Sequence, residues 1–152
     1  MSPPAQHELA QFNISTLRAP LDHPDIADFV AGLTVVNGLA DRSPGFVWRL
    51  QGDDGDLTSV RPYEDERVIV NLSVWADVAA LRDFAYRSAH LDFLRRRGEW
   101  FEPMVGETLV AWWAPIGHRP SIDEAKLRLA LLNERGPSPD AFGVRRPFPP
   151  PG

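Results

Sequence analysis

The chain has 152 residues, 43% of them hydrophobic and 24% charged, which is the size and composition of one globular domain with its own core. A net charge of −5 argues against non-specific nucleic-acid binding, and the lack of cysteine excludes disulfides, thiolate metal sites and cysteine nucleophiles. No apolar run approaches the roughly 20 residues that span a bilayer, and the N-terminus lacks the features of a signal peptide. We therefore expect a cytoplasmic protein that binds neither membranes nor nucleic acids.

The first part of the chain predicts a strand, a helix and a second strand. Residues 1–6 have the character of a loose leader, and residues 7–17 alternate apolar and polar side chains as a half-buried strand does. Proline at position 20 ends this strand, and residues 24–40 then carry apolar side chains at helical spacing. Residues 46–50 alternate again, which predicts the second strand.

The second part repeats this pattern and adds a helix. Residues 68–75 predict a third strand, and Asp77 is placed to cap a long helix that continues to Phe101. Residues 109–113 predict a fourth strand, and Ser121 begins a capping box for a last helix. The order β-α-β-β-α-β with an extra C-terminal helix is the split βαβ, or ferredoxin-like, arrangement of an α+β fold.

The predicted organisation is one α+β domain with a tail. The domain covers residues 7–136, and the tail of residues 137–152 is too rich in proline for a helix or a central strand. A four-stranded sheet that helices cover on one side leaves its other face exposed. Since face-to-face pairing of two such sheets would bury that face, we expect a homodimer.

The long helix predicted after Asp77 carries two apolar stripes, of which the first includes Leu81 and Leu91. The second stripe recurs every three or four residues and consists of Tyr86, His90, Phe93, Arg97 and Trp100. A surface helix needs one apolar stripe only. We therefore expect the second stripe to face a ligand, the tail or a second subunit.

Several segments of the sequence resemble a known superfamily. The pattern W-x-D-x-x-A-L-x-x-F, which starts at Trp75 and precedes His90, resembles the dimeric α+β barrel proteins. That superfamily includes the antibiotic biosynthesis monooxygenases and several haem-binding enzymes. The segments YRSAHLDFLRRRGEWF and WWAPIGHRPSIDEAKLRL are more closely similar to an uncharacterised bacterial family within it, known only as a domain of unknown function. The resemblance implies a dimeric α+β barrel over about residues 8–142.

The resemblance also implies a chemistry. In cofactor-independent polyketide monooxygenases of this superfamily, an Asn and a Trp four residues apart on a strand help to position an aromatic substrate and oxygen. Asn71 and Trp75 match that spacing and share one face of the predicted strand. By this resemblance Asn71 would bond a substrate carbonyl or phenol, and Trp75 would form an aromatic wall. The alternative is that both residues only pack at a buried sheet face.

His90 has three open interpretations. It is a structural histidine, a general base that titrates near neutral pH, or an axial haem ligand, as helical histidines are in some proteins that share this fold. Tyr86 and Phe93 would suit a flat ring system beside it, and Arg97 could reach a carboxylate or propionate. Trp112 and its neighbour point to opposite sides of their strand, and we assign Trp112 to the pocket.

We therefore predict a small-molecule-binding protein, with cofactor-independent monooxygenase chemistry on an aromatic or polyketide-like substrate. The alternatives are a haem protein with His90 as its ligand and a non-catalytic ligand-binding module. The predicted catalytic residues are His90 and Asn71, and the predicted substrate-binding residues are Trp75, Tyr86, Phe93, Arg97 and Trp112. The sequence has no recognisable metal-ligand spacing.

Overall fold

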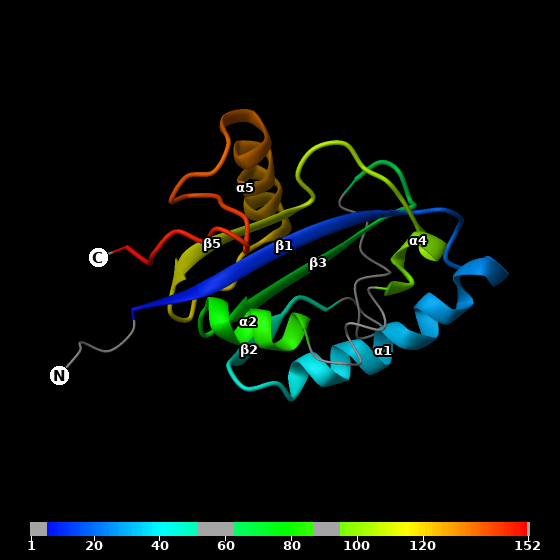
Figure 1. Ribbon diagram of the computed structural model, residues 1–152, viewed down its shortest axis with the longest axis horizontal. Helices are drawn as coiled ribbons and strands as arrows, with labels where there is room; N and C mark the ends of the chain where they lie inside the picture. Colours follow the sequence, from blue (N-terminus) through cyan, green and yellow to red (C-terminus); the bar gives the residue numbers. More distant parts are fainter. Residues whose placement is uncertain (1–5, 52–62, 87–94, 152) are drawn as a thin grey trace.

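The computed structural model describes residues 6–51, 63–86 and 95–151. An antiparallel sheet forms its centre (Figure 1). The sheet consists of β1 (His7–Leu17), β2 (Phe46–Arg49), β3 (Val68–Trp75), the short β4 (Phe101–Glu102) and β5 (Leu109–Pro115). β3 lies between β1 and β2, and both β4 and β5 pair with the other side of β1. Because β3 separates two strands that a helix connects, the βαβ unit is split, and the predicted ferredoxin-like α+β fold is confirmed.

The described helices do not all begin at a capping side chain. They are the 3-10 helix η1 (Pro24–Ile26), α1 (Ala27–Asp41), α2 (Val78–Ala85), α4 (Arg97–Trp100) and α5 (Ile122–Arg135). Asp77 Oδ1 accepts a hydrogen bond of 2.8 Å from the N–H of Ala80 at the start of α2, and Ser121 Oγ accepts one of 3.1 Å from the N–H of Glu124 at the start of α5. Both predicted caps are therefore confirmed. Within the described ranges, no helix has the length and apolar character needed to cross a membrane.

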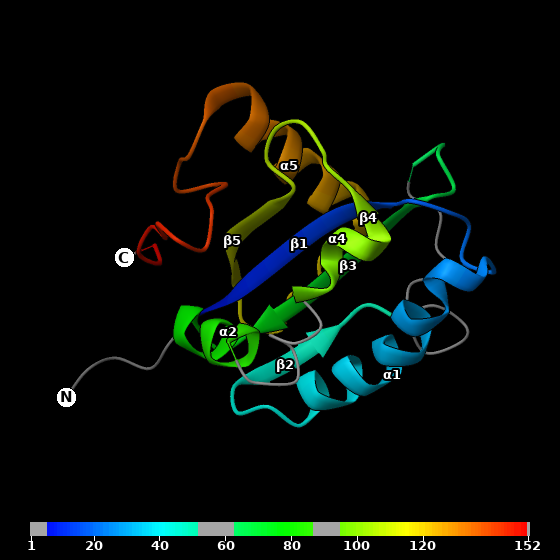
Figure 2. The same ribbon diagram turned by 45° about the vertical axis from the view of Figure 1, so that its right-hand side comes forward.

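Different helices cover the two faces of the sheet (Figure 2). On one face, Phe12, Leu72 and Trp112 pack beneath Leu129 of α5 and are at most 1% exposed. On the other face, Trp75 packs with α1 and α2, and the strand end at Leu17 packs with α1 and α4. The prediction that one face stays open for a partner subunit is therefore wrong, because α5 covers it.

The long helix predicted from Asp77 to Phe101 is also wrong. α2 ends at Ala85, and Tyr86 leaves helical geometry with φ −102° and ψ 11°. Trp100 belongs to the separate helix α4 and packs against Phe29 of α1, with ring centroids 5.6 Å apart. Burial of this indole fixes α4 near the start of α1. Tertiary packing therefore overrides the apolar periodicity, which alone would continue α2 as one long helix. Residues 87–94, with two members of the predicted stripe, lie outside the described residues.

The C-terminal tail folds back onto β5. Phe142 and Ala111 exchange two backbone hydrogen bonds of 2.7 and 2.9 Å, and Phe142 is fully buried. Phe148 lies 5.8 Å from the Phe142 ring, and its carbonyl accepts a 2.8 Å bond from Trp113 Nε1. The tail therefore extends the sheet by one bridge and then covers the face that carries α2.

Gly45 sets the approach of β2 to α2 and yields a test of this packing. Its φ is +81°, and a Cβ there would lie 2.5 Å from the Cβ of Ala80. Gly117 has a similar φ of +88° but open space around it. We expect Gly117→Ala to cost about 1–2 kcal/mol for its backbone conformation, and Gly45→Ala to cost about 1–3 kcal/mol more because of the clash. Urea denaturation measures both, and equal losses would contradict the packing.

Candidate functional site

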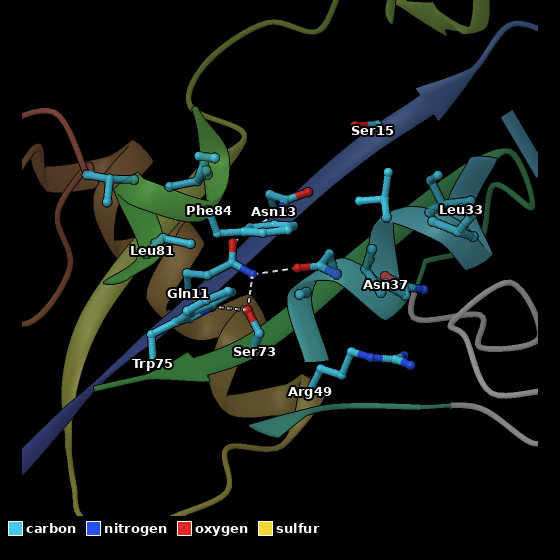
Figure 3. Close-up of a pocket in the computed structure, with 18 of the residues that line it drawn as sticks. Gln11, Asn13, Ser15, Leu33, Asn37, Arg49, Ser73, Trp75, Leu81 and Phe84 are labelled. Carbon is cyan, nitrogen blue, oxygen red and sulfur yellow. Dashed lines mark hydrogen bonds between the residues drawn. The ribbon is translucent and has the colours of Figure 1, made fainter. Parts of the chain in front are cut away.

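A cavity of about 440 Å³ lies between the sheet and helices α1, α2 and α4 (Figure 3). Most of its wall is apolar and aromatic. The apolar residues that line it include Phe29, Leu33, Val36, Phe46, Leu81, Phe84 and Phe101. A largely apolar cavity of this volume is typical of a small-molecule site.

Four polar side chains converge on the floor of this cavity. Gln11 and Asn13 come from β1, and Asn71 and Ser73 come from β3. The strand register places Gln11 opposite Ser73 and Asn13 opposite Asn71. Residues directly opposite each other in an antiparallel pair project to the same face, so the register itself assembles this polar floor.

A hydrogen-bond network orders the floor (Figure 3). Gln11 Nε2 donates to Asn71 Oδ1 at 2.5 Å and to Ser73 Oγ at 2.7 Å, and Gln11 Oε1 accepts from Asn13 Nδ2 at 2.9 Å. Ser73 Oγ also accepts from Trp75 Nε1 at 2.9 Å. Ser73 thus receives two donors, and its own O–H is left to donate. Asn71 Nδ2 has no acceptor among the described residues, so the floor offers a ligand two donors.

Trp75 forms an aromatic wall next to the floor. Its ring stacks on Phe84 of α2 at 5.3 Å with an interplanar angle of 26°, and Phe46 of β2 meets it edge-on at 5.4 Å. Trp75 is only 1% exposed, and its bond to Ser73 satisfies the indole N–H. The wall is therefore held rigidly by packing on both sides and by one polar bond.

Among the described residues, the charged side chains that line the cavity are all arginines. They are Arg49, Arg82, Arg97 and Arg145. Arg49 forms an ion pair with Asp41 at 2.7 Å, and Arg82 donates to the backbone carbonyl of Val144 in the tail. No carboxylate, imidazole or amine occurs in the described part of the lining. This part of the cavity therefore supplies hydrogen-bond donors and positive charge but no carboxylate or imidazole base.

The structure brings most of the predicted site residues to one place. Asn71, Trp75, Tyr86 and Arg97 all line the cavity, with Asn71 and Trp75 at its floor and wall and Tyr86 two-thirds exposed. The two other predicted residues of the long helix, His90 and Phe93, lie outside the described residues. The base and haem-ligand hypotheses for His90 therefore stay predictions.

Trp112 needs correction, because it lies on the opposite face of the sheet. The alternation of β5 places Trp112 with Val110 in the core beneath α5, away from the cavity. Its Nε1 has no hydrogen-bond partner among the described residues, and the guanidinium carbon of Arg128 lies 5.6 Å from its ring centroid. Trp112 is therefore a core residue of the α5 face.

Sequence reasoning missed Gln11 and Asn13, which join Asn71 and Ser73 into one network. Their signal is the run of polar side chains at every second position of the first strand. Such a run is ordinarily the solvent face of a sheet. It points to a site only once β1 is known to be a central strand, with β3 on one side and β5 on the other.

Comparisons with known proteins agree with the fold. Residues 8–152 match the profile of the family described as Domain of unknown function (DUF3291), which is the kind of family that the sequence resembles. No curated protein matches the chain significantly.

Several solved structures are similar to the chain. A putative antibiotic biosynthesis monooxygenase from Nitrosomonas europaea has 11% identity over 79% of this chain and 100% of that one, with a TM-score of 0.51. PA3566 from Pseudomonas aeruginosa has 14% identity over 78% and 100%, also at 0.51. SnoaB, a cofactor-independent oxygenase from Streptomyces nogalater, has 19% identity over 77% and 97%, at 0.48. At these identities the likeness to the first two structures shows the fold alone.

The polar floor predicts a specific stability effect for Ser73→Ala. The substitution removes the acceptor of Trp75 Nε1, a buried donor that has no other partner among the described residues. We expect a loss of about 1–3 kcal/mol in the free energy of unfolding, measured by urea denaturation. Ser15→Ala is the matched control, since Ser15 lines the same cavity outside this network, and we expect a change within about 0.5 kcal/mol. Equal effects of the two substitutions would contradict the network.

Proposed function

This chain belongs to the DUF3291 family, and we propose that it binds a small molecule and acts as a cofactor-independent monooxygenase on an aromatic or polyketide-like substrate. The observation that supports this most is the hydrogen-bonded floor, in which Asn71 and Ser73 keep free donors beside the stacked Trp75. The name of the Nitrosomonas europaea protein, a putative antibiotic biosynthesis monooxygenase, describes that protein and suggests the reaction class to test here.

The proposed reaction needs a substrate that supplies its own electrons. A methylene group between two aromatic rings that a ketone also joins, as in an anthrone, can lose a proton to give a carbanion whose charge is delocalised onto the ketone oxygen, and this carbanion reacts with oxygen. In the balanced reaction, one methylene group and one molecule of dioxygen give one ketone carbonyl and one molecule of water. One oxygen atom becomes the new carbonyl, and the other leaves as water with both hydrogens of the methylene group. The substrate is oxidised and dioxygen is reduced, so no external reductant is required.

The residues of the cavity have defined parts in this proposal. Asn71 Nδ2 and the Ser73 hydroxyl donate to the substrate oxygen, on which negative charge develops when the carbanion forms. Trp75, buried between Phe84 and Phe46, backs the aromatic wall that faces the ring system. The apolar lining excludes water and orients the substrate. Stabilisation of the enolate by these donors lowers the pKa of the substrate, and His90, which lies outside the described residues, stays the predicted base.

Oligomeric state and location also belong to the proposal. The homodimer and the cytoplasmic location expected from the sequence stay predictions. Because α5 covers the second face of the sheet, a subunit contact would use another surface than the sheet face first expected. Sedimentation velocity measures the subunit number directly.

Oxygen consumption with 1,8-dihydroxyanthrone tests the proposed activity. This compound has a methylene group between two rings, a ketone that joins the same rings on the other side and two phenols beside that ketone, and its oxidation is followed with an oxygen electrode. We expect Asn71→Ala to lower kcat/KM about a hundredfold, because one donor to the developing negative charge is lost. Thr34→Ala, on the exposed side of α1, should keep the full rate.

The outcome also separates catalysis from binding. If the unaltered protein consumes no oxygen above the rate in buffer but the anthrone still quenches its tryptophan fluorescence, the protein is a non-catalytic binding module. If Asn71→Ala and Thr34→Ala react at the same rate, Asn71 has no part in the reaction.

A further inference from the structure

We propose that the ligand of the cavity carries a negative charge and that arginines at the cavity recognise it. This inference rests on the proposed function, since it names a property of the molecule that the same cavity binds. The chain has 21 acidic residues and a net charge of −5. None of those acidic residues occurs in the described lining, whereas four arginines do. The described part of the cavity lining is therefore positively charged in an acidic protein.

One of the four arginines is already neutralised. Arg49 donates to both carboxylate oxygens of Asp41, at 2.7 Å through Nε and at 3.2 Å through Nη2. This two-bond pairing on a side chain that is 11% exposed holds the guanidinium in place. Arg49 therefore shapes the wall and adds no net charge to the cavity.

The described partner of Arg82 is uncharged, so it does not neutralise the guanidinium. It is half-buried on α2 and donates to the Val144 carbonyl, and no described carboxylate pairs with it. A guanidinium has five N–H donors, so this bond leaves others free. The same bond ties the tail to α2 and so keeps Arg145, the next residue, at the cavity.

Arg97 has no described carboxylate partner because the acids near it are taken by its neighbour. Arg96 donates to Glu99 at 2.8 Å and to Asp28 at 2.9 Å. The bond from Arg96 lowers the pKa of Glu99, and the bonds to Glu99 and Asp28 raise the pKa of Arg96. This cluster fixes α4 and leaves the Arg97 guanidinium available at the cavity.

The remaining polar groups favour the same kind of ligand. Asn71 Nδ2 and the Ser73 hydroxyl are free donors, which suit a phenolate or enolate oxygen. Guanidinium groups bind carboxylates and similar oxyanions through paired N–H donors. The geometry therefore points to a flat aromatic ligand that lies along the aromatic wall and carries an acidic group recognised by arginines among Arg82, Arg97 and Arg145.

Two fluorescent probes with one ring system test this inference. 8-Anilino-1-naphthalenesulfonate is an anion, and N-phenyl-1-naphthylamine is the same skeleton without the sulfonate. We expect the anion to bind more tightly to the unaltered protein, and more weakly as the salt concentration rises. The double substitution Arg97→Gln and Arg145→Gln should raise the Kd of the anion about tenfold. We expect the loss of each exposed arginine to raise this Kd by a factor of about two to five. The Kd of the neutral probe should stay within about twofold.

Two further variants make the result decisive. Arg135→Gln with Arg146→Gln changes the net charge equally but outside the cavity lining, and should leave both probes unaffected. Leu33→Trp fills the cavity from α1 and should weaken the binding of both probes. Equal affinities for the two probes, or equal effects of the two arginine pairs, would overturn the inference and leave the proposed function standing. If neither probe binds, or if Leu33→Trp changes nothing, the inference and the proposed site both fail.

Discussion

The register between β1 and β3 is the constraint on which the cavity depends. It sets Gln11 against Ser73 and Asn13 against Asn71, and on the other face it sets Phe12 against Leu72. A slip of one residue would turn these side chains over, so that amides would face α5 and apolar groups would face the cavity. The apolar core beneath α5 therefore does more than stabilise the sheet, because it fixes the register that assembles the polar floor.

This arrangement places polar groups where burial is costly. Gln11 is 3% exposed and Ser73 is 5% exposed, and a buried amide or hydroxyl without a partner costs free energy. The two groups compensate each other through bonds that run along the floor from Asn13 to the indole of Trp75. A network of this kind is stable only when it is complete, so it holds the floor in one arrangement before any ligand arrives. Preorganised donors are the property that a site for a developing oxyanion requires.

Much of the frame follows from local patterns, and the errors have a common physical origin. The bounds of β1 and β3 and the caps at Asp77 and Ser121 are predictable, because alternation and capping act over a few residues. Which helix covers each face of the sheet is not predictable from these patterns, because it depends on where α5 packs. That is why the sequence alone assigns Trp112 to the pocket, and why it does not reveal the polar face of β1 as part of a site. The break after Ala85 depends in the same way on the distant anchor of Trp100.

The bridge between Phe142 and Ala111 has a consequence beyond the cavity. β5 forms one margin of the sheet, and a bare margin offers unpaired N–H and C=O groups to any neighbouring molecule. The chain occupies that margin with its own C-terminal segment, and the prolines that follow Phe142 lack the N–H groups that further pairing would need. The segment thus pairs backbone groups of β5 that could otherwise pair with another molecule and promote self-association. Extensions added to this end of the chain would have to keep the Phe142 bridge in place.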